Sequence, residues 1–257
     1  MVKGYCSAPG NQRPARILVS KRSESKSSAL AAEFPDLVQV VENEEVLAGS
    51  DVVFIGLLPA VSREQLPRMP WGGSSSTKLV ISMMAAVDIG ELRSNIDVPH
   101  TQLVRTVPLP CTARRTGPIL VHPILQNCID VLEIVGTPVA CDKEEEMRPL
   151  VCLTGHISSF YQLMQTSEQF MLDHGVGAVA ARTFVSAFYA SMATATETNS
   201  HSLQEMAAEA ATPGGINEQG LDILLDTEHF KNQTDSLEQV HQRLLGNVPY
   251  VKKERKV

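Results

Sequence analysis

The sequence has no run of about 18 consecutive apolar residues, no Cys-x-x-Cys pair and no excess of basic residues. The first absence argues against a membrane-spanning helix, and the polar N-terminus argues against a signal peptide. Five scattered cysteines without a His-paired spacing predict reduced thiols and no metal site in an intracellular, cytoplasmic protein. A formal net charge of −7 gives no reason to expect nucleic-acid binding. The short basic tail at 252–256 is expected to be a solvated terminus.

Short apolar runs alternate with helical segments through the first half of the chain. The expected strands cover residues 16–20, 38–41, 51–58, 78–82, 102–105 and 138–141, and the expected helices cover 24–34, 44–48, 89–94 and 123–135. This alternation predicts a parallel sheet with helices on both faces. Continuously apolar strands indicate that both faces are buried.

From residue 142 onward the pattern changes to one helix after another, with no strand signal. We therefore predict an α/β fold followed by an all-α fold. The first domain, residues 1–141, is an incomplete Rossmann-like dinucleotide-binding sheet, because no Gly-x-Gly-x-x-Gly turn is present to seat a pyrophosphate on a helix N-terminus. The second domain, residues 142–257, is helical.

A basic turn follows the first expected strand. Ser20, Lys21, Arg22 and Ser23 stand where NAD enzymes place an acidic residue on the ribose hydroxyls, whereas basic residues there suit a 2′-phosphate. Two cations and two hydroxyls can hydrogen-bond a phosphate well. The turn therefore predicts NADP (NADPH) rather than NAD as cofactor, and a solvated basic turn is the alternative.

A second candidate site lies in the helical half, at the stretch from Thr212 to Asn217. Pro213 ends the preceding helix, and Gly214 and Gly215 let the backbone approach a ligand closely. Asn217 is expected to be the N-cap of the next helix. Bare N–H groups behind two glycines suit a carboxylate or phosphate, although a helix–helix connection without a ligand has the same spacing.

The same stretch resembles the Ser/Thr-Pro-Gly-Gly-x-Thr motif of pyrroline-5-carboxylate reductases, in their C-terminal dimerisation domain. Thr212, Pro213, Gly214 and Gly215 match the motif, and the resemblance implies substrate-binding roles for Thr212, Gly214, Gly215 and Ile216. Asn217 stands where the family has a threonine whose hydroxyl contacts the substrate, so the resemblance makes it both a substrate-binding and a catalytic candidate.

Further partial matches follow in family order along the chain. The family's Ala-Val-Lys-Pro appears here as Gly56-Leu57-Leu58-Pro59, and its Ser-x-x-Ala-Gly appears as a segment that includes Ala85. Its Met-Pro-Asn-Thr-Pro turn beside the nicotinamide appears as a segment with Pro108 and Leu109. The resemblance implies cofactor-binding roles for Leu57, Pro59, Ala85, Pro108 and Leu109. The family's lysine and asparagine are both replaced.

The opening Met1-Val-Lys-Gly-Tyr resembles the end of the family's first helix. The resemblance implies that the family's first strand, glycine-rich turn and most of that helix are missing. We favour a start at an internal methionine, and the alternative is a variant that dispenses with the phosphate cradle.

Two further residues fall within motifs. His156 lies where the family has its Ser-Gly-Ser-Gly-Pro-Ala-Tyr helix start, and it could protonate an imine or bind an anion. A structural histidine is the alternative. Cys111 follows Pro110, and nothing nearby argues for a lowered pKa, so we expect a packed cysteine.

The resemblance predicts an NAD(P)H-dependent reductase of a cyclic imine, of the type used in proline biosynthesis. Its partners would be a small-molecule substrate with a carboxylate and further copies of the chain, as a homodimer or ring of dimers. The alternative is a non-catalytic relative that acts as a dimeric assembly or ligand-binding module.

Overall fold

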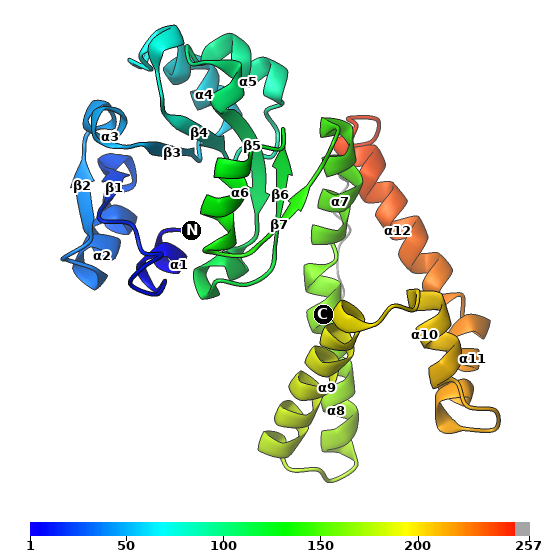
Figure 1. Ribbon diagram of the computed structural model, residues 1–257. Helices are drawn as coiled ribbons and strands as arrows, with labels where there is room; N and C mark the ends of the chain where they lie inside the picture. Colours follow the sequence, from blue (N-terminus) through cyan, green and yellow to red (C-terminus); the bar gives the residue numbers. More distant parts are fainter. Residues whose placement is uncertain (250–257) are drawn as a thin grey trace. The chain divides into compact units, whose positions relative to one another are not determined.

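The computed structural model describes residues 1–249, so the basic tail lies outside the described residues. The chain forms two compact units, Met1–Met147 and Arg148–Val257 (Figure 1). The sequence analysis placed the boundary near residue 142, shortly before η6.

The first unit contains all the strands in the described part of the chain. Its elements are α1 (Val2–Cys6), β1 (Ile17–Ser20), η1 (Lys21–Ser23), α2 (Glu24–Glu33), β2 (Val38–Val41), α3 (Asn43–Gly49), β3 (Val52–Ile55), α4 (Pro59–Gln65), η2 (Leu66–Arg68), η3 (Gly73–Ser75), β4 (Leu79–Ser82), α5 (Ile89–Asn95), η4 (His100–Gln102), β5 (Leu103–Pro108), η5 (Pro110–Arg114), β6 (Pro118–His122), α6 (Gln126–Glu133), β7 (Thr137–Ala140) and η6 (Glu144–Glu146). The predicted alternation of strands and helices is confirmed.

The strands form two separate sheets. Strands β1 and β2 pair in parallel, while a second sheet has the order β3-β4-β5-β6-β7. Strands β3, β4 and β5 are mutually parallel, but β6 is antiparallel to β5 and carries β7 parallel to itself. Parallel pairing is confirmed within β1–β2 and within β3–β5, and β6 is a strand that the sequence analysis missed.

Helices cover both faces of the larger sheet, as predicted. Successive residues of β4 point to opposite faces: Val80 packs with Leu47 of α3 and Leu92 of α5. Ile81 packs with a second cluster that includes Leu132 of α6 and Tyr5 of α1. All four residues of β4 are buried, which places the core of the unit around this strand.

The break between the two sheets lies between β1 and β3, which the chain joins through β2 and α3 (Figure 1). Each of these two strands pairs on one side only among the described residues. They nevertheless share packing, because Ile17 of β1 lies against the same cluster as Val52 and Phe54 of β3. Arg16 also donates a 2.8 Å hydrogen bond to the Gly49 carbonyl at the end of α3.

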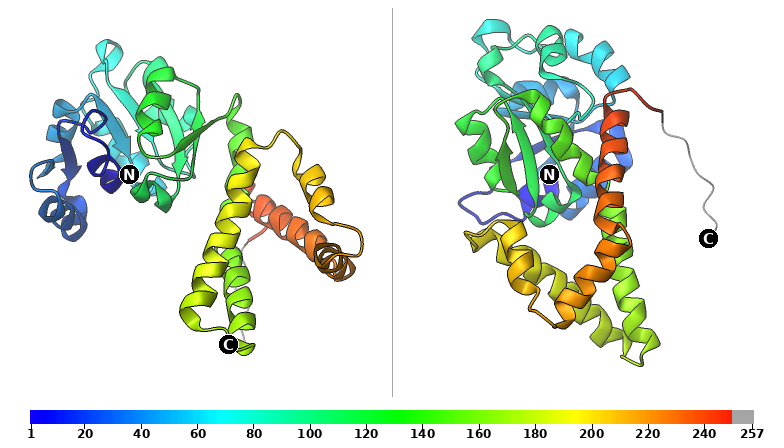
Figure 2. Two further views of the ribbon diagram at one scale, coloured as in Figure 1. Left: turned by 60° about the horizontal axis from the view of Figure 1, so that its bottom comes forward. Right: turned by 90° about the vertical axis from the view of Figure 1, so that its right-hand side faces the viewer.

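The second unit is helical, as predicted. Its elements are α7 (Met147–Thr154), α8 (Ile157–Asp173), α9 (Ala178–Thr198), α10 (Leu203–Ala210), α11 (Ile216–Asp226) and α12 (His229–Leu244), with α8 and α9 packed side by side (Figure 2). The apolar side chains that it buries in the described residues are few: Cys152, Ala181 and Val185. Many large apolar side chains of this unit are therefore exposed on the single chain.

Among the described residues, no helix combines the length and the apolar character that crossing a bilayer would require. All five cysteines are free thiols, and four of them are buried.

Candidate active site

The residues predicted to hold the cofactor lie at one edge of the sheets. Ser20 ends β1 and Lys21–Ser23 follow it, Leu57 and Pro59 follow β3, and Ala85 follows β4. Pro108 and Leu109 lie at the end of β5. Because β1, β3, β4 and β5 belong to parallel pairs, these are carboxyl ends, and open α/β sheets bind ligands outside the carboxyl ends of their strands.

The turn after β1 is held by two serine hydroxyls. Ser20 is the N-cap of η1, and its hydroxyl accepts a 3.3 Å hydrogen bond from the Arg22 amide. Its carbonyl accepts a 2.6 Å bond from the Ser27 hydroxyl. Lys21 forms an ion pair with Glu42, directly after β2. The exposed Arg22 guanidinium has no partner among the residues that the structure describes, so it is the cation left for a ligand.

The turns after β3 and β5 are short and begin helical segments. Pro59 is the first residue of α4, a position that tolerates a missing N–H. Leu57 is half-buried and packs against the core, whereas Leu58 is 71% exposed. The Leu109 carbonyl accepts a 2.9 Å hydrogen bond from the buried Thr112 hydroxyl, which fixes the start of η5.

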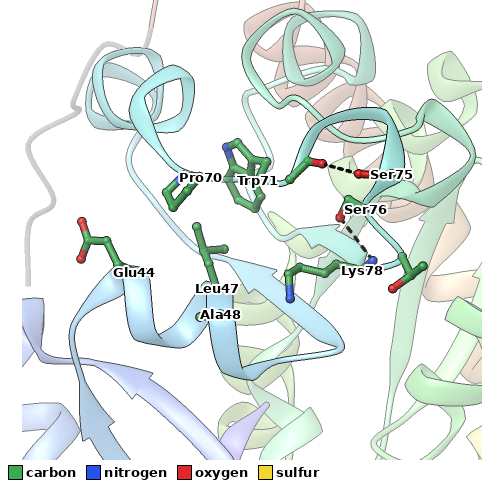
Figure 3. A pocket seen from close by; sticks show the side chains of 10 residues that line it. Glu44, Leu47, Ala48, Pro70, Trp71, Ser75, Ser76 and Lys78 are labelled. Carbon is green, nitrogen blue, oxygen red and sulfur yellow. Dashed lines mark hydrogen bonds between the residues drawn. The ribbon is translucent and has the colours of Figure 1, made fainter.

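A cavity of about 360 Å³ lies away from these ends (Figure 3). It is bounded by Leu47 and Ala48 of α3 and by the segment from Pro70 to Lys78, which precedes β4. The cavity is therefore at the amino-terminal side of β4, and it brings together none of the predicted site residues. Lys78 donates a 2.9 Å hydrogen bond to the Ser50 carbonyl.

The joint between α10 and α11 differs from the predicted one in detail. Helix α11 begins at Ile216 with Gly215 as its N-cap, so the prediction that Asn217 is the N-cap is wrong. The Asn217 side-chain amide instead donates a 3.1 Å hydrogen bond to the Ala210 carbonyl at the end of α10. An Asn inside the first turn can reach back in this way, because the two glycines fold the chain sharply, with Gly214 at φ +73°.

The amide donors at this joint are partly used by the chain itself. Gly214 donates to a Glu218 carboxylate oxygen at 2.6 Å, and Gly215 donates to the Thr212 carbonyl at 2.8 Å. Glu218 lies in the first turn of α11, where the helix dipole favours a negative charge. A side-chain carboxylate of the same chain therefore occupies one of the donors of the joint, and its role as an anion site stays a prediction. Ile216, beside it, is 86% exposed.

The two other candidates have defined surroundings. His156 is the N-cap of α8, and its Nε2 lies 3.0 Å from the Ser236 hydroxyl of α12. Cys111 lies in η5, is half-buried, and faces Gly117. Neither residue shares a described cluster with other titratable groups, and the described residues contain no group of three His, Cys, Asp or Glu side chains placed to hold a metal ion.

Comparisons with known proteins bear on this arrangement. Residues 2–86 match the family model described as NADP oxidoreductase, coenzyme F420-dependent. The solved pyrroline-5-carboxylate reductase of Coxiella burnetii superposes with a TM-score of 0.79 over 97% of this chain and 94% of its own, at 16% identity. The chain has the pyrroline-5-carboxylate reductase fold.

Two other solved structures share this fold. The pyrroline-5-carboxylate reductase of Streptococcus pyogenes gives a TM-score of 0.73 at 16% identity, covering 92% of this chain and 91% of that one. The pyrroline carboxylate reductase of Plasmodium falciparum, solved with NADP bound, gives 0.70 at 14% identity, covering 91% and 98%. No curated protein sequence matches the chain. The resemblance found in the motifs is therefore confirmed for the fold along almost the whole chain.

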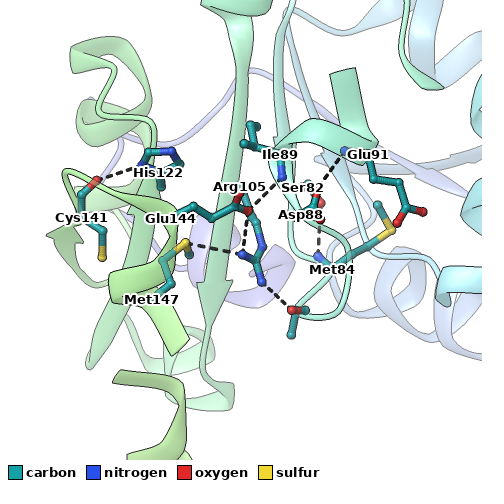
Figure 4. A network of polar contacts seen from close by, with 11 residues as sticks. Ser82, Met84, Asp88, Ile89, Glu91, Arg105, His122, Cys141, Glu144 and Met147 are labelled. Carbon is teal, nitrogen blue, oxygen red and sulfur yellow. Dashed lines mark hydrogen bonds and ion pairs between the residues drawn. The ribbon is translucent and has the colours of Figure 1, made fainter. Parts of the chain in front are cut away.

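Within this reductase fold, the sequence analysis missed one buried polar group at the carboxyl edge. Arg105 of β5 and Glu144 of η6 form an ion pair of 2.7 Å, and their side chains are only 12% and 18% exposed (Figure 4). Arg105 stands inside an apolar strand, Leu103–Pro108. A cation inside an otherwise apolar strand was the available signal, because a buried charge requires a partner.

Proposed function

We propose that this chain is an NADPH-dependent reductase of a carbon–nitrogen double bond in a small cyclic imine, resembling pyrroline-5-carboxylate reductase. The observation that carries the proposal is the position of the basic turn. Ser20–Ser23 lie at the carboxyl end of a parallel strand, and the other five cofactor-binding candidates lie at or after the carboxyl ends of strands in the same unit. The family model that matches residues 2–86 describes NADP oxidoreductases, which supports NADP as the cofactor.

The residues present fit the phosphate-bearing adenosine end of NADP. Arg22 offers an exposed, unpaired guanidinium, and a guanidinium binds phosphate oxygens through two parallel N–H donors. Lys21, although paired with Glu42, adds positive charge beside it. NADPH supplies a hydride, which would pass to the imine carbon.

The chain's own residues would bind and orient the substrate rather than form a covalent bond to it. Positioning contributes most of the catalysis in such a reaction. In our proposal the joint at Thr212–Asn217 holds the substrate carboxylate through backbone N–H groups, and His156 supplies a proton to the imine nitrogen. The Asn217 side-chain amide donates its hydrogen bond to the Ala210 carbonyl, so we assign Asn217 the role of fixing the backbone of the joint.

We further propose that the protein works as a homodimer or a ring of dimers. The helical unit buries little apolar surface in one chain, while Phe184, Phe188 and Met192 of α9 are each about half-exposed. These three residues are spaced at i, i+4 and i+8, and therefore form one face of the helix. Exposed apolar surface of this extent is typical of an interface.

Calorimetric titration with NADPH and NADH tests the proposal. We expect NADPH to bind at least tenfold more tightly, since a charged hydrogen bond contributes about 1.5–3 kcal/mol and 1.4 kcal/mol is a factor of ten. Arg22→Ala should remove this preference. Arg93→Ala is the matched control, because Arg93 is also exposed but lies in the last turn of α5. Equal affinities of the unmodified protein for the two nucleotides would contradict the proposal.

A second candidate function is a non-catalytic, dimeric ligand-binding or assembly module. The separation of β1–β2 from the larger sheet favours it, because the pyrophosphate of a dinucleotide normally lies where the two halves of a continuous sheet meet. A protein that is dimeric but binds neither nucleotide in the titration would support this module over the reductase.

A further inference from the structure

Arg105 is a charged residue in the buried part of the sheet. It lies on β5 between Val104 and Thr106, both fully buried, and its side chain is 12% exposed. A charge removed from water in this way needs several partners, and an ion pair with incomplete hydrogen bonding adds little stability. The partners of Arg105 therefore indicate what the residue does.

Three contacts surround the guanidinium (Figure 4). One terminal nitrogen donates to Glu144 Oε1 at 2.7 Å and lies 3.9 Å from the Met147 sulfur. The other donates to the Ala85 carbonyl. The Nε–H is buried and has no partner among the described residues. The guanidinium is thus held between one carboxylate and one backbone carbonyl and is not fully satisfied, which is unusual for a purely stabilising pair.

Glu144 completes a clamp on the loop between β4 and α5. The same Oε1 atom accepts a 2.8 Å hydrogen bond from the Ile89 amide, the first residue of α5. The loop from 83 to 88 is therefore held at Ala85 by Arg105 and at its far end by Glu144. Ala85 and Ala86 are exposed within it, so the clamp holds an exposed backbone at the carboxyl edge of the sheet.

We propose that Arg105 and Glu144 are positioning residues that set the 83–88 loop for the nicotinamide half of NADPH. This inference rests on the proposed reductase function. The adenosine half is assigned to the turn after β1, in the other sheet, and the clamp touches neither β1 nor Arg22. The two halves of the cofactor are thereby held by separate groups, and each can be tested alone.

Arg105→Lys and Glu144→Gln are the test variants, because each keeps most of the side-chain volume while losing the two-point geometry or the charge. The probes are NADPH and adenosine 2′,5′-bisphosphate, which has the phosphate-bearing adenosine half only. We expect each variant to bind NADPH about tenfold more weakly, to raise KM for NADPH more than it lowers kcat, and to bind the bisphosphate as the unmodified protein does.

The matched control is Arg63→Lys. Arg63 and Glu91 form an ion pair of the same length, 2.7 Å, between α4 and α5, with the Arg63 side chain 60% exposed. This variant should bind both probes normally. A merely structural role for Arg105 would lower the Tm and weaken both probes equally, and this result would overturn the inference.

The outcome also separates this inference from the proposed function. If the unmodified protein binds neither probe, the reductase proposal fails. If the unmodified protein binds NADPH and both variants bind it equally well, only the clamp is refuted. Glu144→Gln keeps the second test open should Arg105→Lys fail to fold, since Glu144 lies in the short η6 segment rather than in the sheet core.

Discussion

The Glu218 carboxylate accepts a 2.6 Å hydrogen bond from the Gly214 amide, one of the donors that the two-glycine joint offers. The chain therefore carries its own carboxylate at the place proposed for that of the substrate. A ligand carboxylate has to displace this side chain, so Glu218 sets how tightly the joint binds an anion.

Glu218→Gln is expected to tighten the binding of L-proline, a cyclic amino acid of the product type, by about tenfold. The substitution removes a negative charge that competes for a donor, and a charged hydrogen bond contributes about 1.5–3 kcal/mol. Titration in the presence of NADP measures the change. Asp222→Asn, one turn further along α11, removes the same charge away from Gly214 and should have little effect. Equal changes in the two variants would indicate a general charge effect instead.

Replacement of Phe188 by Asp is expected to dissociate the oligomer. Phe188 is 47% exposed on the single chain and stacks with Phe184 at a centroid distance of 6.1 Å, on the face of α9 that we assign to the partner copy. Burying a carboxylate in an apolar interface is costly. Light scattering should show the mass of one chain. Leu58→Asp, at a 71% exposed apolar residue of the first unit, serves as control and should leave the mass unchanged.

The cysteines are expected to differ sharply in reactivity. Burial raises the pKa of the Cys128 thiol to about 12, so almost none of it is thiolate at about pH 8, and no solvent reaches it. Alkylation of the native protein followed by peptide mass spectrometry should find Cys111, the half-buried thiol, modified first. Rapid modification of Cys128 under the same conditions would show that α6 opens readily.

Two helical glycines should respond to alanine in opposite directions. A Cβ at Gly4 of α1 would collide with the Thr112 carbonyl oxygen, whereas a Cβ at Gly220 of α11 meets nothing within 4 Å. We expect Gly220→Ala to stabilise the protein by about 0.5–1 kcal/mol and Gly4→Ala to destabilise it by about 1–3 kcal/mol. Chemical denaturation at one fixed protein concentration measures both. A stabilising Gly4→Ala would show that α1 does not rest on η5.

Much of the fold follows from local patterns in the sequence. The runs around Val53 and Ile81 are apolar and bounded by turn residues, and both form the expected buried strands. Strand β6 was missed because its apolar core is only Ile119, Leu120 and Val121, directly before Pro123, which we assigned to a helix start. The break in the sheet agrees with the incomplete sheet expected from the sequence, because the first strand of a Rossmann sheet lies between the strands that are β1 and β3 here.

The candidate site shows the same limit. The strand ends that carry Arg22 and Ala85 were predicted, because a strand's end is a local property. The Arg105–Glu144 pair joins residues that are 39 positions apart. Glu218 accepts its hydrogen bond from Gly214 at a helix start whose N-cap is Gly215 rather than the expected Asn217. Such contacts arise from the packed chain. These two contacts therefore could not be read from the sequence motifs of the site.

The β1–β2 sheet is separate from the larger sheet, and this has a consequence for local opening of the backbone. A ribbon of two strands is marginally stable by itself, and the four residues of β1 are all only half-buried, whereas Val80 and Ile81 are inaccessible. Backbone amides of Val19 and Val40 should therefore exchange with deuterium much faster than those of β4. Arg22 lies in the turn directly after β1, so NADPH bound to Arg22 should also stabilise this pair of strands. Saturating NADPH should therefore slow deuterium exchange in β1 and β2 and leave exchange in β4 unaltered.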